Sequence, residues 1–284
     1  MYRELNIWLL GGDQRQLHLA HSLSADGHTT HLYGLDTPES DADLTQIHRA
    51  DCIIFPLPVA DEDLFLYAPL SHLRISMESI LPQLSPSQFL CGGRVSSSLD
   101  KVFQNYNLTI QDYFMQEELI VSNAIPTAEG ALQIAMEQLP ITIHDCQVLI
   151  LGFGRIGQAA ARRFSALGAK VTVAARNYAQ LALAHSMSLN TQPLSPLAGW
   201  LCSYDLIINT IPAPVLGAKE LHDTKEDCLI LDLASAPGGV DRSAANIQTR
   251  CIIHAPGLPG KVAPATAGRA IQRTIYHMLT ETGL

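Results

Sequence analysis

The segment that most restricts the fold of this sequence is a glycine-rich turn between an apolar run and an alanine-rich stretch. Residues 148–151 read Val-Leu-Ile-Leu, and Gly152, Gly154 and Gly157 follow with the spacing G-x-G-x-x-G. Gly152 permits a tight turn, Gly154 lets the backbone approach a pyrophosphate, and Gly157 lets the next helix pack on the strand. The N-terminus of that helix offers N–H groups and a partial positive charge to an anion. The motif therefore predicts a Rossmann dinucleotide site, and an ordinary glycine-rich turn is the alternative.

A cation follows the second strand of this predicted site. Arg176 follows the strand region 170–174 and lies 19 residues after Gly157. At this position, proteins that bind NAD usually carry Asp or Glu. A carboxylate there repels a 2′-phosphate, whereas a guanidinium attracts it with roughly 1.5–3 kcal/mol. Arg176 therefore predicts a preference for NADP(H). The alternative is a solvent-exposed arginine with relaxed cofactor choice.

Short β-type runs alternate with helical stretches twice along the chain, which is typical of α/β sheets. We expect two doubly wound parallel-sheet domains, the second a Rossmann domain, with a cleft between them and a C-terminal helix that packs back on the first domain. The predicted domains are residues 1–125, joined by 265–284, and residues 126–264. The expected strands are 6–10, 29–33, 52–55, 88–91, 108–112, 147–151, 170–174, 205–210, 228–233 and 251–254, and the expected helices are 15–25, 127–138, 155–167, 178–186 and 265–282.

Composition excludes several classes of function. The chain has 284 residues, 47% of them hydrophobic, and a net charge of −9. This apolar content is enough for a packed core, and the acidic balance argues against binding to nucleic acid or to an anionic membrane. No apolar run approaches the roughly 20 residues of a membrane helix, and the cysteines form no C-x-x-C pair. We therefore expect a cytoplasmic protein.

Polar and Gly/Pro-rich segments follow the later strands of the predicted Rossmann domain. Because ligands bind at the carboxyl ends of strands in open α/β sheets, Asn209 and Thr210 are expected to bond the ribose or shape the nicotinamide pocket. Satisfying the backbone of their own loop is the alternative for both side chains. The predicted cofactor contacts are Gly152, Gly154, Arg155, Ile156, Gly157, Arg176, Asn177, Asn209, Thr210, Ile211, Pro212 and Ala234.

Beyond the generic Rossmann pieces, three further motifs occur in a fixed order, and with them the chain resembles the dipicolinate synthase A family from end to end. The stretch 60–69 and the C-terminal end depart from the family pattern. The three motifs are Gly11-Gly12-Asp13-x-Arg15-Gln16-Leu17, Asn123-x-Ile125-Pro126-Thr127-x-Glu129-Gly130 and Ala255-Pro-Gly-Leu-Pro-Gly260-x-Val262-Ala-Pro264-x-Thr266-Ala-Gly268.

The resemblance implies an activity and a partner. The expected reaction is oxidation of a dihydrodipicolinate-type cyclic imine to dipicolinate, with hydride transfer to NADP⁺, during sporulation. The implied partner is dipicolinate synthase B, a flavoprotein-like protein, and we also expect a homo-oligomer. Two rival functions stay open: an enzyme like alanine dehydrogenase or a hydroxyacid dehydrogenase, and a non-catalytic protein that senses NADP for a partner.

A dicarboxylate substrate needs hydrogen-bond donors in this acidic protein. Arg15, a candidate catalytic residue, begins the first predicted helix, where a guanidinium and a helix N-terminus together suit a carboxylate. Asp13 is a candidate catalytic residue or the cap of that helix. Gln16 either hydrogen-bonds the ligand or is an exposed helix residue.

Three further candidates lie in the later motifs. Residues 126–129 indicate a helix N-terminus, with Thr127 as its cap and Glu129 favoured by the helix dipole. A functional alternative places both in the cleft, Thr127 on the substrate and Glu129 as proton acceptor. Lys261 either meets a substrate carboxylate or is exposed. The histidines show no metal-binding spacing, so we predict no metal, and a structural role is expected for His254.

Overall fold

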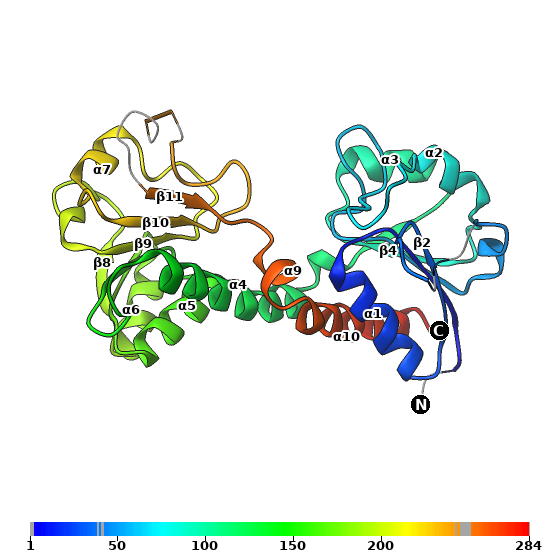
Figure 1. The fold of residues 1–284 in the computed structure, drawn as a ribbon, viewed down its shortest axis with the longest axis horizontal. Helices are drawn as coiled ribbons and strands as arrows, with labels where there is room; N and C mark the ends of the chain where they lie inside the picture. Colours follow the sequence, from blue (N-terminus) through cyan, green and yellow to red (C-terminus); the bar gives the residue numbers. More distant parts are fainter. Residues whose placement is uncertain (1–2, 39, 41–42, 242, 245–250, 284) are drawn as a thin grey trace. The chain divides into compact units, whose positions relative to one another are not determined.

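The chain forms two compact α/β units. The structure, a computed structural model, describes residues 3–38, 40, 43–241, 243–244 and 251–283 (Figure 1). The first unit comprises residues 1–123 together with 263–284, and the second comprises residues 124–262. None of the helices in the described ranges combines the length and the hydropathy that a bilayer span requires.

The first unit is built on five parallel strands in the order β2-β1-β3-β4-β5. The chain passes from β1 to β2 on one side and then crosses to β3 on the other side of β1. The carboxyl ends of β1 and β3 therefore form a topological switch point, where ligands of such sheets bind. The strands are β1 (Asn6–Leu10), β2 (Thr29–Tyr33), β3 (Cys52–Ile54), β4 (Phe89–Gly92) and β5 (Ile110–Asp112).

Alternating side chains of β1 enter two apolar layers. Ile7 and Leu9 pack with helices α1 and α10, whereas Trp8 and Leu10 pack with helices α2 and α3. This period of two places helices on both faces of the sheet. The helices of this unit are α1 (Gln14–Ala25), α2 (Met77–Ile80), α3 (Ser97–Asn105), the first part of α4 (Glu117–Gln138) and α10 (Pro264–Thr282), with short 3₁₀ turns η1 (Ile47–Arg49), η2 (Leu81–Gln83) and η3 (Tyr113–Met115).

The second unit contains six parallel strands in the order β11-β10-β9-β6-β7-β8, which is the Rossmann order read from its far edge. Its switch point lies between β6 and β9. The strands are β6 (Gln147–Leu151), β7 (Lys170–Ala175), β8 (Asn190–Pro193), β9 (Leu206–Asn209), β10 (Leu229–Asp232) and β11 (Cys251–His254), and the helices are the rest of α4, α5 (Arg155–Ala166), α6 (Tyr178–Ser186), α7 (Ala218–Asp223) and α9 (Leu258–Val262), with the 3₁₀ turn η4 (Leu201–Ser203). The fold class predicted from the sequence, two parallel-sheet α/β units, is thereby confirmed.

The predicted start of the long helix α4 is wrong. Helix α4 begins at Glu117, ten residues before the start expected near Thr127, so Thr127 lies within the helix and caps nothing. Pro126 misled the prediction because a proline disfavours helix at the preceding residue and removes one intrahelical hydrogen bond. The helix continues through Pro126, and Glu117 and Glu118 place acidic groups in its first turn, where the helix dipole favours them.

Strand β8 was not predicted from the sequence. Its residues, Asn-Thr-Gln-Pro, are polar and largely exposed, so they show neither an apolar run nor alternation. The strand exists because its backbone pairs with β7, with Thr172 opposite Asn190 and Ala175 opposite Pro193. A proline at the end of an edge strand leaves no inner ladder bond unmade.

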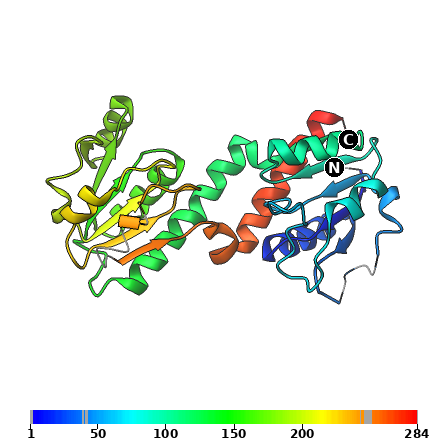
Figure 2. The ribbon, with the colours of Figure 1, turned by 90° about the horizontal axis from the view of Figure 1, so that it is seen from above.

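The C-terminal helix α10 returns to the unit that contains the N-terminus (Figures 1 and 2). Ala270, Ile271 and Ile275 join the same apolar layer as Leu19 and Leu23 of α1. The two helices lie close together at Gly268, where a Cβ atom would lie 2.8 Å from the Arg15 carbonyl oxygen.

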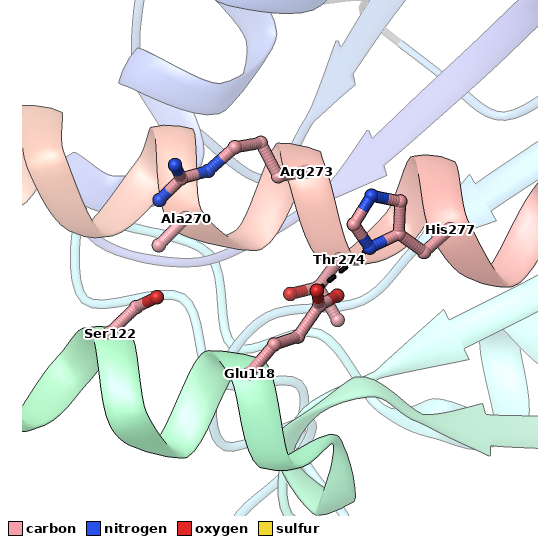
Figure 3. Close-up of a pocket in the computed structure, with 6 residues that line it drawn as sticks. All are labelled: Glu118, Ser122, Ala270, Arg273, Thr274 and His277. Carbon is pink, nitrogen blue, oxygen red and sulfur yellow. Dashed lines mark hydrogen bonds and ion pairs between the residues drawn. The ribbon is translucent and has the colours of Figure 1, made fainter.

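A small groove separates α10 from the start of α4 in the first unit. It has a volume of about 170 Å³ and is bridged by His277 Nδ1 and Glu118, whose Oε2 lies 2.7 Å away (Figure 3). The pair is exposed, so its contribution to stability is at most about 1 kcal/mol. Packing with α1, more than this pair, therefore holds α10 in place.

We expect Gly268→Ala to destabilise the protein. The added methyl group meets backbone of α1 that does not move easily, at a cost of about 1–3 kcal/mol, which exceeds the gain of roughly 1 kcal/mol from the higher helix propensity of alanine. Thermal or urea unfolding measures the effect. The control is Thr266→Ala, an exposed change in the same helix, and equal stability of the two variants would contradict the close contact.

Candidate functional site

The turn between β6 and α5 in the second unit is shaped by its glycines. Gly152 has a φ of +92°, and its N–H donates to the Ala174 carbonyl oxygen at 2.8 Å. A Cβ atom on Gly152 would lie 2.6 Å from Thr210 Oγ1, and a Cβ atom on Gly157 would lie 2.3 Å from the Gly152 carbonyl oxygen. Both positions therefore exclude any side chain.

Gly154 differs from its two neighbours because it faces open space. A Cβ atom on Gly154 would have no atom of the described chain within 4 Å. Gly154 is also the N-cap of α5, so the cap position itself offers no side-chain acceptor to the first N–H groups, and the first turn of α5 contains no acidic residue. Exposed Arg155 and half-buried Ile156 follow at once. This arrangement fits the pyrophosphate of a dinucleotide, which needs N–H donors and close backbone approach.

Arg176 lies one residue beyond β7 and is exposed. In the described part of the chain it makes no ion pair or hydrogen bond. The next residue, Asn177, caps helix α6, because its Oδ1 accepts from Ala179 N at 2.8 Å. The structure thus gives Asn177 a structural task and leaves the Arg176 guanidinium available to a ligand.

The loop after β9 is tied to the glycine turn and to its own backbone. Thr210 Oγ1 donates to the Leu151 carbonyl oxygen at 2.8 Å. Asn209 is fully buried, and its amide is bonded to Ile211 and Asp232. The Asn209 side chain thus satisfies its own loop and Asp232, and its contact with the ribose stays a prediction. Half-buried Ile211, exposed Pro212 and buried Ala234 line the ends of β9 and β10.

A second cluster lies at the switch point of the first unit. Asp13 caps α1, since its Oδ1 accepts from Arg15 N at 3.0 Å. The same carboxylate accepts from Arg15 Nε at 2.9 Å and from Nη2 at 2.8 Å. Arg15 Nη2 also donates to the Leu57 carbonyl oxygen at 2.7 Å, in the loop that follows β3. The structure thus shows Asp13 as the cap of α1 and as the partner that fixes the guanidinium, and its catalytic role stays a prediction.

The Arg15 guanidinium is largely buried, with 12% of its side chain exposed. Burial alone lowers the pKa of Arg15, but the hydrogen bond and the charge of Asp13 outweigh it and leave that pKa raised. Within the described residues the third nitrogen, Nη1, makes no hydrogen bond. A carboxylate ligand can therefore be recognised by Nη1 without breaking the Asp13 pair.

Tyr67 belongs to this cluster, although sequence reasoning did not single it out. Burial raises the pKa of the Tyr67 phenol, the charge of Asp13 raises it further, and Arg15 opposes the shift. The phenol is therefore protonated, and a donor, at neutral pH. The Tyr67 carbonyl oxygen accepts from Gly12 N at 2.7 Å, which holds this loop against the Gly11-Gly12 turn.

Gln16 is 2% exposed, and its Nε2 donates to the Ile54 carbonyl oxygen at 3.0 Å. The expectation of an exposed helix residue is therefore wrong. Gln16 supports the end of β3 from within the unit, and its contact with substrate stays a prediction.

The three later candidates belong to the second unit. Glu129, on α4, accepts from Arg163 Nε at 3.2 Å and Nη2 at 2.9 Å. Thr127 is buried within the same helix. Lys261 is exposed in α9. Helix α9 packs against α4 through Leu258, which would lie 3.1 Å from a Cβ atom on Gly130. The Arg163 pair gives Glu129 a structural role, so its catalytic role and the substrate contacts of Thr127 and Lys261 stay predictions.

The fold and the glycine turn define a protein with a dehydrogenase-like Rossmann unit, which implies a nicotinamide cofactor. A family model for the N-terminal domain of dipicolinate synthase A matches residues 6–114, and one described as shikimate / quinate 5-dehydrogenase matches residues 133–258. Dipicolinate synthase A of Bacillus subtilis (strain 168) is 32% identical over 290 residues, which cover 99% of this chain and 98% of that protein. The chain belongs to the dipicolinate synthase A family.

Solved structures agree with this assignment. Dipicolinate synthase A from Bacillus halodurans superimposes with a TM-score of 0.89 and 32% identity over 97% of each chain. The transhydrogenase of Sinorhizobium meliloti has a TM-score of 0.74 at 13% identity, covering 96% of this chain and 92% of that one. At that identity the likeness concerns the fold alone.

Two alanine substitutions in the glycine turn should separate binding from folding. Gly154→Ala should weaken nicotinamide dinucleotide binding at least about tenfold, because its methyl group enters the space that a pyrophosphate needs, and should cost at most about 1 kcal/mol of stability. Gly157→Ala should instead destabilise the fold by about 1–3 kcal/mol, since its methyl group meets the Gly152 carbonyl. Calorimetry and thermal unfolding measure both, and full binding by Gly154→Ala would contradict the assignment.

Proposed function

We propose that this chain is a cytoplasmic NADP-dependent oxidoreductase that converts a dihydrodipicolinate-type cyclic imine to dipicolinate during sporulation. The observation that carries the proposal is the family membership together with a glycine turn that places Gly154 at the start of α5 and is followed, after β7, by Arg176. In the same proposal the chain acts with dipicolinate synthase B and assembles as a homo-oligomer.

The residues of the second unit fit the cofactor. Gly154 and the first N–H groups of α5 would hold the pyrophosphate, and Arg176 would hold the 2′-phosphate. Thr210 and Ile211 would border the nicotinamide half, beside the end of β6. When bound, the cofactor supplies a nicotinamide C4 that accepts a hydride.

The first unit supplies recognition of the dicarboxylate. Arg15 Nη1 and the Tyr67 hydroxyl are donors, and the Asp13 carboxylate holds the guanidinium in one orientation. Two carboxylates of one substrate ring need at least two such donor groups in a protein with a net charge of −9. Asp13 thus contributes by orienting Arg15, and Glu129 is the candidate proton acceptor of the proposed reaction.

The chemistry balances without any further oxidant. One C–H bond of the dihydro ring breaks, and the hydrogen leaves with both bonding electrons as a hydride to the dinucleotide. A different hydrogen of the ring leaves as a proton to a base or to water. The product ring is an aromatic pyridine, so aromatisation drives the step. The protein mainly has to bind and orient the ring and exclude water.

The test is turnover by purified protein. The protein is assayed with freshly prepared dihydrodipicolinate and NADP⁺, once alone and once with dipicolinate synthase B. NADPH and pyridine-ring absorbance should appear at the same rate as each other. Turnover of alanine or a hydroxyacid would support the dehydrogenase alternative. Tight NADPH binding without turnover, even with dipicolinate synthase B present, would support a sensing role and overturn the proposal.

The cofactor preference depends on Arg176. Arg176→Asp should weaken NADPH binding about 10- to 100-fold, because a charge-assisted contact to the 2′-phosphate becomes a repulsion. NADH binding should change little. Calorimetric titration of both dinucleotides measures the difference, and equal losses for both would remove the assigned role.

The substrate role of Arg15 can be tested with its charge retained. Arg15→Lys should raise the KM for the dicarboxylate about tenfold or more while NADPH affinity is unchanged, because lysine lacks the planar fork that bonds Asp13 and leaves Nη1 free. The matched control is Arg74→Lys, in an exposed pair with Asp63 of the same unit. An unchanged KM for Arg15→Lys would contradict the assignment.

A further inference from the structure

Three polar residues form a row along the carboxyl edge of the second sheet. Asn209, Asp232 and His254 are the last residues of β9, β10 and β11, and the ladder register places Asp232 opposite both of the others. The sequence separates them by more than twenty residues at each step, so only the strand order brings them together.

Asp232 is the centre of this row. Its side chain is buried, with the whole residue 3% exposed. Oδ1 accepts from Asn209 Nδ2 at 2.8 Å and from Ala234 N at 3.3 Å, and Oδ2 accepts from Gly239 N at 3.1 Å. A buried carboxylate is costly unless N–H donors surround it, and here those donors come from the last side chain of β9 and from the backbone of the loop after β10.

Asn209 transmits the position of Asp232 to the loop after β9. Its Nδ2 donates to the Ile211 carbonyl oxygen at 3.0 Å as well as to Asp232, and its Oδ1 accepts from Ile211 N at 3.1 Å. Both amide hydrogens are therefore used. Asn209 can shape the Thr210-Ile211 loop but has no donor left for a ligand.

The loop after β10 is built closely around the same carboxylate. A Cβ atom on Gly238 would lie 2.6 Å from Asp232 Oδ2, and one on Gly239 would lie 2.1 Å from Asn209 Nδ2. Gly238 also has a φ of +85°, which favours glycine. These two glycines let the backbone fold onto Asp232 and donate to it.

His254 ends the row with an unused nitrogen. Its Nδ1 lies 3.7 Å from Asp232 Oδ2, beyond hydrogen-bond distance, and is buried without a partner among the described residues. Asp232 is therefore held by neutral N–H donors rather than by an arginine or a lysine.

We propose that Asp232 is a positioning residue for the nicotinamide half of the dinucleotide. It acts through Asn209 on the Thr210-Ile211 loop and through Ala234 and Gly239 on the loop after β10. These loops lie on the β9 and β10 side of the switch point, whereas Arg176 follows β7 on the adenosine side. The inference rests on the cofactor site of the proposed function and adds a residue that does not touch the cofactor.

The experiment divides the cofactor into halves. Asp232→Asn keeps the size of the side chain but places an NH₂ group against an N–H donor, so one loop loses its anchor. We expect NADP⁺ affinity to fall about tenfold or more, as befits the loss of a charged hydrogen bond, and affinity for 2′-phospho-ADP-ribose to change less than about twofold. Calorimetry at a temperature where each variant is folded measures both.

The control is Asp205→Asn, at the opposite end of the same sheet. Asp205 accepts from Gln147 N at 2.8 Å and pairs with Lys225, so this variant loses a comparable anchor away from the carboxyl edge. Its affinities for both ligands should match the wild type at a similar loss of thermal stability. If Asp232→Asn fails to fold, Asn209→Ser, which breaks the link to Asp232, should give the same selective loss.

Each other outcome overturns the inference. Equal losses of NADP⁺ and 2′-phospho-ADP-ribose affinity would mean that Asp232 only supports the fold, and unchanged NADP⁺ affinity would mean that it has no role in binding. A wild-type protein that binds neither ligand would overturn the proposed function itself. That result is distinguishable because it appears before any substitution is made.

Discussion

The structure depends on parallel pairing between strands that are distant in sequence, β1 with β3 and β6 with β9. In each pair the connections leave in opposite directions, so the carboxyl ends stay uncovered. Side chains span both openings: Arg15 donates to the Leu57 carbonyl in the first unit, and Thr210 donates to the Leu151 carbonyl in the second. The candidate residues of both units are thereby held on backbone that the strand ladders already fix.

Much of the fold was predictable because apolar runs, glycine turns and helical stretches are local signals. Strands β6 and β11 were placed at their observed bounds, as was helix α6. The failures occur where the local signal is absent or misleading. Strand β8 is polar and exists only through pairing with β7, and Pro126 suggested a boundary that the rest of helix α4 overrides.

The candidate site was predictable only where one motif carries the chemistry. The glycine turn and Asp13-x-Arg15 are contiguous in sequence, and their geometry follows from a strand end and a helix start. Tyr67 and the Asp232–His254 row are not contiguous with them. Tyr67 reaches the cluster through a loop without a motif, and the row exists only because β9, β10 and β11 are neighbours in the sheet.

Arg15 and Asp232, both buried at a carboxyl edge, are compensated for the free-energy cost of burial in different ways. The difference indicates what each side chain can do. Arg15 shares its charge with a single carboxylate and keeps one guanidinium nitrogen outside that pair, so it can still recognise an anion. The Asp232 carboxylate accepts hydrogen bonds from N–H donors of the protein itself. These bonds stabilise one conformation of the surrounding loops. This second arrangement lowers the electrostatic cost of a carboxylate near an anion site, because N–H donors of the protein already surround the carboxylate. An acidic protein can therefore form an anion site with few cations, provided that the carboxylates near the site are hydrogen-bonded within the protein.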